Sequence, residues 1–325
     1  MAREIQELTL KPQRILMIGG TGFLGSHLAH RLSREGHFLR LPTRRRERAK
    51  HLLTLPTCEV IEADVHDPAR LAELLAGQDA VISLVGILQG GQGLPYGAGF
   101  ARAHVELPQK IAAAAQAAGV RRVLHVSALK AAADAPSGYL RSKAAGEQAL
   151  REVDLDLTVF RPSVIFGDGD RFLNVFSKLL RKAPFLPLAC PDALFQPVWV
   201  EDVAACIAVS LAQFDSIGQT YELCGPRQYT LRQLVEYVGM VTGQRRPILG
   251  LSDRLSYLQA WAMEFVPGGP LSRDNYDSMQ SPSVCETGCV LPFGRLATAL
   301  EAIAPLYLNN VRRTNNDVLR MKAGR

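Results

Sequence analysis

Three residues, Ser127, Tyr139 and Lys143, have the types and the spacing of an acid/base site. Tyr139 and Lys143 are four residues apart in a helical sequence pattern, so they share one helix face and the ammonium group lies beside the phenol. A free phenol has a pKa of about 10, and a neighbouring positive charge lowers it toward useful acid/base chemistry. Ser127 follows the apolar run 122–126 and is expected to hydrogen-bond the reacting oxygen. We therefore predict that these three residues are catalytic, with Tyr139 as the general acid/base.

A glycine-rich turn near the N-terminus gives this tyrosine–lysine pair its context. The apolar run 15–18 leads into Gly19, Gly22 and Gly25, and a helical pattern begins inside the turn. Such glycines let the backbone approach a pyrophosphate, while the helix N-terminus offers free N–H groups and the positive end of its dipole. A purely structural turn is the alternative, but the strand–turn–helix order favours dinucleotide binding. The predicted phosphate-binding residues are Gly19, Thr21, Gly22, Phe23, Leu24 and Gly25.

The end of the second expected strand indicates which dinucleotide is bound. A carboxylate there pairs with the ribose of NAD, whereas an arginine accommodates the 2′-phosphate of NADP. Arg44 and further arginines follow this strand, and no acid ends it. We expect NADP(H) to be preferred, with NAD(H) as the alternative cofactor; a solvated helical turn would explain the same charges without a ligand. Asp64 and Val65, after the third strand, are expected near the adenine, although a turn carboxylate needs no ligand.

These residues lie in a regular alternation of short apolar runs and longer helical patterns. Such alternation is typical of a parallel sheet with crossover helices, in which ligands bind at the carboxyl ends of the strands. We expect strands at 14–18, 38–41, 59–62, 80–85, 122–126 and 157–160, and helices at 22–34, 68–75, 102–118 and 139–151. The predicted fold class is α/β, a doubly wound parallel sheet (Rossmann) with a smaller C-terminal substrate or lid subdomain.

After residue 162 the pattern becomes irregular and rich in turn residues. The runs 195–200 and 220–223 are still strand-like, and we expect both to return to the first sheet. The expected division is a dinucleotide-binding Rossmann domain of residues 12–162 with 195–224, a substrate or lid subdomain of 163–194 with 225–310, and a basic tail of 311–325. Apolar residues within 172–186 and 255–265 are either core or lid, and as a lid they favour an apolar substrate.

The composition excludes several classes of protein. Of 325 residues, 47% are hydrophobic and 21% are charged, which is typical of a folded, water-soluble protein. The uncharged stretch 80–101 contains Gln89, Gln92 and Pro95, which argue against a membrane span, and the N-terminus lacks an export signal, so we expect the cytoplasm. Six cysteines without a C-x-x-C pair indicate reduced thiols and no metal site. Basic residues are not interleaved with aromatic residues, which argues against nucleic-acid binding.

The net charge of +6 is concentrated in the basic tail 311–325. Such a tail could bind an acidic lipid surface or a protein partner, and a solvated terminus is the simpler interpretation. Peripheral contact with a membrane therefore stays open beside the cytoplasmic location.

The motifs taken together resemble those of the extended and atypical short-chain dehydrogenase/reductases. They are residues 19–25 (GGTGFLG), 82–88 (ISLVGIL), 125–129 (HVSAL), 139–147 (YLRSKAAGE), 161–167 (RPSVIFG) and 195–203 (FQPVWVEDV). Within that superfamily, of the NAD-dependent epimerase/dehydratase type, the chain resembles the branch that contains the NADPH-binding accessory subunit of respiratory complex I and its bacterial relatives. The resemblance implies that further residues contact the cofactor: Leu84, Val85 and Gly86 on its ribose side, and Pro162, Ser163 and Val164 at the carboxamide. Beside their acid/base role, Tyr139 and Lys143 are also expected to contact the cofactor, and Lys143 could hold the nicotinamide ribose.

Two functions stay open on these grounds. The intact Ser127, Tyr139 and Lys143 favour an oxidoreductase or epimerase that acts on a small, apolar carbonyl or quinone substrate. The resemblance favours a non-catalytic cofactor-binding protein in the assembly or stability of a respiratory or quinone-linked complex. His104, where many extended members carry an asparagine, is interpreted as a helix-face residue, and the glycine-rich loop 89–99 could admit a substrate or a partner. One scaffold serves both functions, so the fold class does not choose between them.

Overall fold

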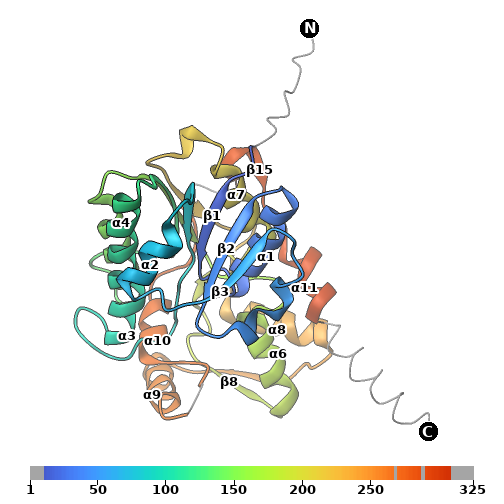
Figure 1. Ribbon diagram of the computed structural model, residues 1–325. Coiled ribbons are helices and arrows are strands. Elements are labelled where there is room, and N and C mark those ends of the chain that lie inside the picture. Colours follow the sequence, from blue (N-terminus) through green and yellow to red (C-terminus); the bar gives the residue numbers. More distant parts are fainter. Residues whose placement is uncertain (1–10, 267–268, 287–289, 309–325) are drawn as a thin grey trace.

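The computed structural model describes residues 11–266, 269–286 and 290–308, and its centre is a seven-stranded sheet (Figure 1). The expected basic tail 311–325 lies outside the described residues. The strands of the sheet are β1 (Arg14–Ile18), β2 (Phe38–Thr43), β3 (Cys58–Glu62), β4 (Ala80–Ser83), β5 (Arg122–Val126), β6 (Asp156–Pro162) and β11 (Thr220–Leu223).

All neighbouring strands of this sheet are parallel, in the order β11-β6-β5-β4-β1-β2-β3. The chain runs outward from β1 to one edge and then outward from β4 to the other, so the strand order reverses between β1 and β4. Ligands of doubly wound sheets bind at this reversal, outside the carboxyl ends of the strands. The predicted α/β fold and the positions of its N-terminal strands are confirmed.

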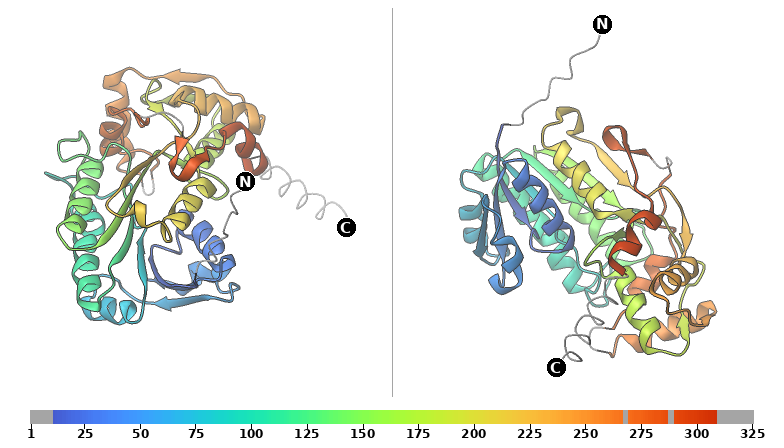
Figure 2. Two further views of the ribbon diagram at one scale, coloured as in Figure 1. Left: turned by 90° about the horizontal axis from the view of Figure 1, so that it is seen from above. Right: turned by 90° about the vertical axis from the view of Figure 1, so that its right-hand side faces the viewer.

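Helices cover both faces of the sheet (Figure 2). On one face, α1 (Phe23–Arg34) and α7 (Val200–Ser210) share a buried cluster with β1. On the other face, α2 (Pro68–Leu75), α4 (Leu107–Ala118) and α5 (Gly138–Arg151) form a second cluster. The central strand β4 is buried at every position, as expected for a parallel strand that is covered on both sides. Shorter helices lie between these elements: η1 (Arg46–Leu52), α3 (Ala98–Phe100) and the π-helical turn η2 (Ala101–Glu106).

The rest of the chain packs around a third buried cluster beside the sheet. Its main helices are α6 (Phe172–Lys182), α8 (Leu231–Thr242) and α11 (Leu300–Leu308). The remaining strands are short: β7 (Ile165–Phe166), β8 (Leu186–Leu188), β9 (Leu194–Phe195), β10 (Val198–Trp199), β12 (Tyr229–Thr230), β13 (Ile248–Gly250), β14 (Val290–Leu291) and β15 (Arg295–Leu296). The remaining helices are α9 (Asp253–Met263), α10 (Arg273–Met279) and the 3-10 turns η3 (Phe214–Ser216) and η4 (Pro292–Gly294).

One of the two later strand-like runs joins the main sheet. Thr220–Leu223 forms β11 beside β6, as predicted. The prediction for residues 195–200 is wrong, because β9 pairs with β12 and β10 pairs with β7 in separate two-stranded sheets. β11 already pairs with the free edge of β6 up to Pro162. β10 therefore pairs with β7, which follows β6 in the chain.

The expectation of reduced thiols is wrong for one pair of cysteines. Cys224, directly after β11, and Cys285 form a disulfide across a sequence separation of 61 residues. Both side chains are buried beside Leu129, whereas Cys58, Cys190 and Cys206 are free thiols. Two cysteines can pair only when their Cα atoms lie within about 7 Å, and the fold decides that separation.

The uncharged stretch 80–101 runs from β4 through a loop into α3, in agreement with the sequence interpretation. Among the helices of the described ranges, none is long and apolar enough to cross a membrane.

Candidate cofactor and active site

The glycine turn between β1 and α1 is shaped by close backbone contacts. Gly19 has φ +86°, and a Cβ atom built on it would lie 3.1 Å from the carbonyl carbon of Leu84. A Cβ on Gly25 would lie 2.5 Å from the Gly19 oxygen, so a side chain there would push α1 away from the turn. Gly22 is the N-cap of α1 and offers no side-chain hydrogen bond, which leaves the first N–H groups of the helix for a ligand. The turn therefore fits a pyrophosphate, with Thr21, Phe23 and Leu24 at the helix start.

The segment after β4 lies directly against this turn. Leu84 N–H donates to the Ile18 carbonyl at 2.8 Å, which continues the pairing of β4 with β1. The next carbonyl, that of Val85, accepts from Lys143 Nζ at 3.0 Å. A Cβ built on Gly86 would lie 3.5 Å from the same nitrogen. The structure thus brings Leu84, Val85 and Gly86 between the glycine turn and the helix that carries Tyr139.

Lys143 ties together the ends of two strands. Besides Val85, its Nζ donates to the Val126 carbonyl at 3.1 Å, next to Ser127, and the side chain is buried. Burial lowers the pKa of Lys143 to about 8, and the carboxylate of Glu147 partly opposes that shift. Glu147 is in turn held by Arg161 of β6 through two hydrogen bonds of 2.9 and 2.7 Å. An ammonium group has three N–H donors, and the two carbonyls accept from two of them.

Tyr139 is partly buried at the start of α5, and the expected lowering of its pKa by Lys143 is wrong. Burial raises the pKa of Tyr139 to about 12, with a smaller contribution from the negative charge of Asp274. The physical reason is that Lys143 directs its charge to two backbone carbonyls, where it does not offset the loss of water around the phenol. The phenol therefore keeps its proton at neutral pH.

His104 forms part of the wall around Tyr139. Its ring centre lies 5.5 Å from that of Tyr139 and 5.5 Å from that of Phe100. Its Nε2 accepts from the Ile87 N–H at 3.0 Å, so in the neutral ring Nδ1 carries the proton and donates to Ser142 Oγ at 2.9 Å. Burial lowers the pKa of His104 to about 2, which keeps the ring neutral. The interpretation as a helix-face residue missed this buried link between the segment after β4 and α5.

The turn that carries His104 is π-helical and packs unusually close to α5. A Cβ built on Gly146 would lie 2.0 Å from the His104 carbonyl oxygen. π-helical turns are often found at functional sites because they re-aim side chains within a helix. Sequence periodicity alone does not reveal such a turn, since the pattern continues on both sides.

Asp274 of α10 holds the N-terminus of α5 in place. Its Oδ1 accepts from the Gly138 N–H at 2.7 Å, and its Oδ2 accepts from the Tyr139 N–H at 3.2 Å. Burial raises the pKa of Asp274, and the two N–H donors oppose that shift. Sequence reasoning missed this residue because 135 residues separate it from Tyr139, and no local signal marks a cap supplied from such a distance.

Ser127 lies at the carboxyl end of β5, as predicted. Its N–H donates to the Phe160 carbonyl at 2.7 Å, and its side chain is 4% exposed. Its Oγ is buried and has no hydrogen-bond partner within the described ranges. An unpartnered buried hydroxyl costs about 1 to 3 kcal/mol, so a ligand oxygen that completes this hydrogen bond would be favoured.

The segment after β6 is covered by residues 283–285 from the C-terminal part of the chain, which we call the strap. Ser163 Oγ donates to the Ser283 carbonyl at 2.8 Å, and the Leu129 N–H donates to the Pro162 carbonyl at 3.0 Å. The Val164 carbonyl accepts from the Val198 N–H at 3.0 Å. The strap is closed two residues further on by the Cys224–Cys285 disulfide. Pro162, Ser163 and Val164 thus lie at the end of the sheet where a nicotinamide carboxamide would be bound.

Arg44 and Asp64, which are expected at the adenosine end of the cofactor, are exposed. Arg44 follows β2 with its side chain in solvent, where a 2′-phosphate could meet it. Asp64 Oδ1 accepts from the His66 N–H at 2.9 Å, and its other oxygen lies 3.8 Å from an Arg102 nitrogen. Asp64 is therefore a turn residue in the structure, and Val65 beside it is partly buried.

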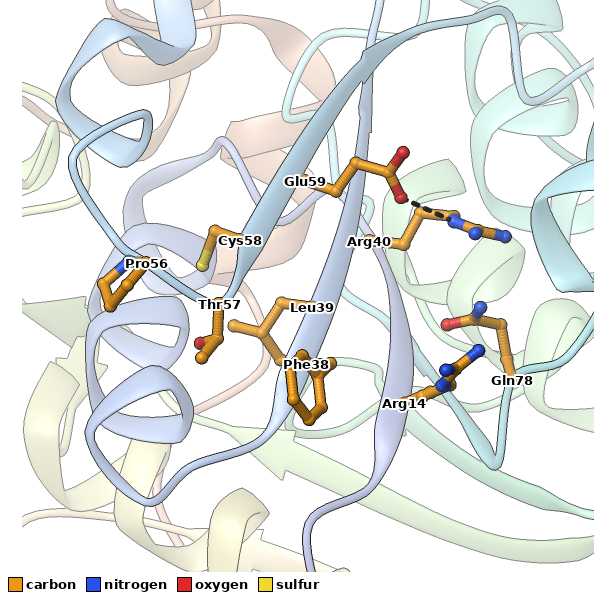
Figure 3. A pocket seen from close by; sticks show the side chains of 9 residues that line it. All are labelled: Arg14, Phe38, Leu39, Arg40, Pro56, Thr57, Cys58, Glu59 and Gln78. Carbon is orange, nitrogen blue, oxygen red and sulfur yellow. Dashed lines mark hydrogen bonds and ion pairs between the residues drawn. The ribbon is translucent and has the colours of Figure 1, made fainter.

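A pocket of about 300 Å³ lies elsewhere, at the amino ends of β1, β2 and β3 (Figure 3). Arg40 points across it to Glu59, with 3.2 Å between Nε and Oε2, and a second Arg40 nitrogen donates to the Leu74 carbonyl at 3.0 Å. This end of the sheet is opposite the glycine turn, so the pocket is separate from the candidate site. Within the described residues, no group of three or more His, Cys, Asp or Glu side chains could hold a metal ion.

The fold and the glycine turn define a nucleotide-cofactor-binding protein of the Rossmann class, and comparisons with known proteins identify its family. A family model described as NAD(P)H-binding matches residues 19–177. The chain is 31% identical over 241 residues to the ceramide reductase of Caulobacter vibrioides, with 74% of each protein covered. The chain belongs to the NAD(P)-binding short-chain dehydrogenase/reductase superfamily of the epimerase/dehydratase type.

The chain also resembles subunits of respiratory complex I. It is 34% identical over 227 residues to the mitochondrial NADH dehydrogenase (ubiquinone) 1 alpha subcomplex subunit 9 of Arabidopsis thaliana. That match covers 68% of this chain and 56% of the plant protein, so it spans little more than half of the relative's length.

Solved structures share the fold at low sequence identity. A UDP-glucuronic acid 4-epimerase from Bacillus cereus, in complex with UDP-glucuronic acid and NAD, has a TM-score of 0.70 at 15% identity, covering 93% of this chain and 99% of that one. MoeE5 in complex with UDP-glucose and NAD has a TM-score of 0.67 at 20% identity, with the same coverage. At such identities these likenesses support the fold alone.

Proposed function

We propose that the protein is an NADP(H)-dependent oxidoreductase that reduces the carbonyl or quinone group of a small apolar substrate, with Tyr139 as the proton donor. The observation that carries this proposal is the buried Ser127 Oγ without a partner, at the carboxyl end of β5. A substrate oxygen bound there would accept a hydrogen bond from Ser127 Oγ. It would also lie near α5, whose Lys143 reaches the neighbouring Val126 carbonyl. Bound NADPH supplies the hydride in such a reaction.

The protonated phenol of Tyr139 is available as a proton donor. A carbonyl that is reduced needs a proton at its oxygen, and a phenol whose pKa is raised to about 12 carries that proton at neutral pH. Asp274 accepts from the Gly138 N–H at the start of α5, and His104 is hydrogen-bonded to Ser142 of the same helix, so contacts from distant elements position the phenol. Lys143 orders the ends of β4 and β5 next to it.

The cofactor roles follow from the arrangement of the segments around the carboxyl ends of the strands. We assign the pyrophosphate to the turn Gly19–Gly25, the 2′-phosphate to Arg44 and the ribose to Lys143 and the segment after β4. The carboxamide is assigned to residues 162–164. The preference for NADP(H) over NAD(H) depends on Arg44, because no carboxylate ends β2 to receive a free 2′-hydroxyl.

The substrate and location proposals depend on relatives and on apolar surface. The relative from Caulobacter is a ceramide reductase, and this chain exposes several large apolar side chains on α9. We infer a long-chain or otherwise apolar carbonyl or quinone as the substrate. A cytoplasmic location with contact to a membrane surface is consistent with such a substrate.

A second candidate function is favoured by the complex I relatives. In it, NADPH stabilises the fold, and the protein assists the assembly or stability of a respiratory or quinone-linked complex without turnover. The matching NADH dehydrogenase subunits, 34% identical in one case, support this candidate.

Tyr139→Phe distinguishes the two functions. We expect NADPH oxidation with a panel of apolar carbonyls and quinones to fall about 100-fold to 10,000-fold, while NADPH affinity stays nearly unchanged, because the phenol acts in proton transfer. Lys143→Met should weaken both turnover and affinity. Tyr237→Phe on α8, outside the site, is the matched control and should change neither.

The opposite result is equally informative. If the parent protein binds NADPH but turns over no member of the panel, and Tyr139→Phe changes nothing, the oxidoreductase proposal fails. The non-catalytic function then remains, and it requires that bound NADPH raise the melting temperature of the protein.

A further inference from the structure

We propose that α9 and the adjoining β8–β13 edge form a docking surface for a lipid bilayer with anionic headgroups. The surface is named the α9 face, and its large exposed apolar side chains are Phe185, Leu249, Leu255, Tyr257, Leu258, Trp261, Phe265 and Val266. This proposal concerns a surface outside the cofactor site and does not depend on turnover.

The apolar residues of α9 form one stripe along the helix. Leu255, Leu258 and Trp261 follow one another at intervals of three residues, and they are 52%, 53% and 44% exposed. Phe265, just after the helix, continues the stripe and is 71% exposed. The opposite side of α9, with Ser256 and Ala260, is buried against the protein. The helix therefore packs through its small residues and turns its large apolar residues to solvent, the reverse of a helix in a protein core.

Hydrogen bonds hold α9 beside the short strands β8 and β13. Gln259 Nε2 donates to the Pro187 carbonyl at 3.1 Å, and the Leu251 N–H donates to the Leu188 carbonyl at 3.0 Å. Phe185, before β8, and Leu249, in β13, are 48% and 52% exposed. In Figure 1, α9 and β8 lie together along the lower edge of the molecule, and the right-hand view of Figure 2 keeps them at one end. The exposed residues thus belong to one end of the protein.

The charges around the α9 face are mostly positive. Within residues 181–187 and 243–266, the basic residues are Arg181, Lys182, Arg245, Arg246 and Arg254, and the acidic residues are Asp253 and Glu264. Five positive and two negative charges leave +3. Glu264 is paired with Arg273 at 2.8 Å, whereas Asp253 accepts a hydrogen bond from the neutral Tyr276 hydroxyl at 2.6 Å and keeps its negative charge. The net charge of these two segments is therefore positive, as an anionic surface requires.

A hollow of about 440 Å³ is lined by residues of α6, α8 and β13, and its β13 residue, Ile248, directly precedes the exposed Leu249 of the α9 face. Its lining combines apolar side chains with two basic residues, Arg245 and Arg246, and one acidic residue, Glu236. Met240 beside it is 50% exposed. Apolar side chains that are bordered by arginines match the boundary between acyl chains and headgroups, where a peripheral helix inserts its apolar face about 5 to 10 Å deep.

The aromatic residues favour a bilayer over a protein partner as the occupant. Trp261 and Tyr257 combine an apolar body with a polar tip, and such side chains are enriched at membrane interfaces. A row of protruding apolar side chains can insert into a bilayer without a matching surface. A stable protein interface, in contrast, needs a complementary surface and buries about 1,200 Å² or more in total. We therefore assign the α9 face to a lipid surface.

Vesicle binding by the full chain tests the proposal. The parent protein should co-sediment with vesicles of phosphatidylcholine that contain one third phosphatidylglycerol, and should bind pure phosphatidylcholine several-fold more weakly. Leu258→Glu should lower binding by about tenfold, because it places a charge in the inserted stripe.

Lys182→Glu with Arg254→Glu should lower binding to the anionic vesicles by about fivefold per charge and make it less sensitive to salt. Phe214→Glu, at an 85% exposed phenylalanine on η3, is the matched control and should bind like the parent.

A second measurement reports insertion directly. The chain has two tryptophans, so Trp199→Phe leaves Trp261 as the only one. Its emission should shift to shorter wavelength with anionic vesicles and be quenched by brominated acyl chains. An unshifted emission, equal binding by Leu258→Glu and Phe214→Glu, or no binding by the parent would overturn the proposal. A dimer in solution that Leu258→Glu dissociates, without vesicle binding by the parent, would assign the α9 face to a protein contact instead.

Discussion

The two ends of the candidate site are built in different ways. The phosphate end is one continuous stretch, Gly19 to Gly25, whose shape comes from backbone contacts that a Cβ atom would break. The Tyr139 end is assembled from separate segments: the end of β4, the π-helical turn, α5, α10 and the strap at Ser283. The first end therefore depends on local conformation, and the second on contacts between distant parts of the chain.

This difference teaches which changes each end tolerates. A substitution inside the glycine turn is expected to act on cofactor binding directly, because the close backbone contacts there leave no room for a side chain. A change far from Tyr139, in α10 or the strap, reaches Tyr139 through hydrogen bonds to α5 and to the segment after β6.

Opening the Cys224–Cys285 disulfide should weaken the assembled end most. The bond closes a loop of 61 residues, and its loss through reduction or Cys285→Ser should lower the free energy of unfolding by roughly 2 to 4 kcal/mol. Urea unfolding with and without dithiothreitol measures this, and Cys190→Ser, at a free thiol, is the control. Hydrogen exchange should speed up in the strap and α10 and stay unchanged in α1. Superimposable unfolding curves would contradict the prediction.

Gly25→Val should damage the phosphate end alone. The added Cβ would meet the Gly19 oxygen and the Gly20 backbone at 2.5 and 2.6 Å, and such overpacking costs about 1 to 3 kcal/mol. NADPH affinity, measured by fluorescence titration, should fall at least tenfold. Ala117→Val, at an exposed position of α4, controls for the lower helix propensity of valine. Unchanged affinity in Gly25→Val would remove the turn from the cofactor site.

The buried His125 of β5, two residues before Ser127, should also make the protein sensitive to acid. Burial lowers the pKa of His125 to about 3, and neither ring nitrogen has a hydrogen-bond partner in the described part of the chain. The unfolded chain binds a proton below about pH 6.5 and the folded chain does not, so stability falls as the pH drops from 6.5 toward 3. At pH 5 this loss is about 2 kcal/mol for a shift of this size.

His125→Leu tests that sensitivity. It removes the titrating group and two unpartnered nitrogens, so the free energy of unfolding should depend less steeply on pH between 5 and 7 than in the parent. His30→Leu, at an exposed histidine of α1, should keep the parent's slope. Equal slopes in the parent and His125→Leu would show that the ring is charged or hydrated in the folded protein.

Arg44→Ala should have the smallest effect, and it sharpens the cofactor assignment. Arg44 is exposed, so its contact with a 2′-phosphate is screened over about 8 Å at physiological ionic strength and is worth about 1 kcal/mol. NADPH affinity should fall several-fold, more at low salt, while NADH affinity stays constant. Arg34→Ala, at the far end of α1, should change neither affinity. Equal affinities for the two cofactors in the parent would leave no role for Arg44 in the choice.

The burial of two apolar helices, α6 and α9, could not be predicted from the sequence. Residues 172–186 and 255–265 are both rich in large apolar side chains, and each set is compatible with core or lid. In the structure, α6 buries Leu173 and Leu180 in the third cluster, whereas α9 leaves Leu255, Leu258 and Trp261 exposed. Which helix finds a partner depends on neighbours from elsewhere in the chain, and local periodicity carries no information about them.

The sequence by itself determined the parallel sheet, the glycine turn and the places of Ser127, Tyr139 and Lys143 on their elements. Each of these depends on periodicity or backbone freedom within a few consecutive residues. Only the tertiary structure decided the Asp274 cap, the His104 link, the Cys224–Cys285 disulfide and the pairing of β10 with β7. These contacts join groups up to 136 residues apart in the sequence, so no local pattern encodes them. Likewise, burial in the folded chain, rather than residue type, raises the pKa of Tyr139.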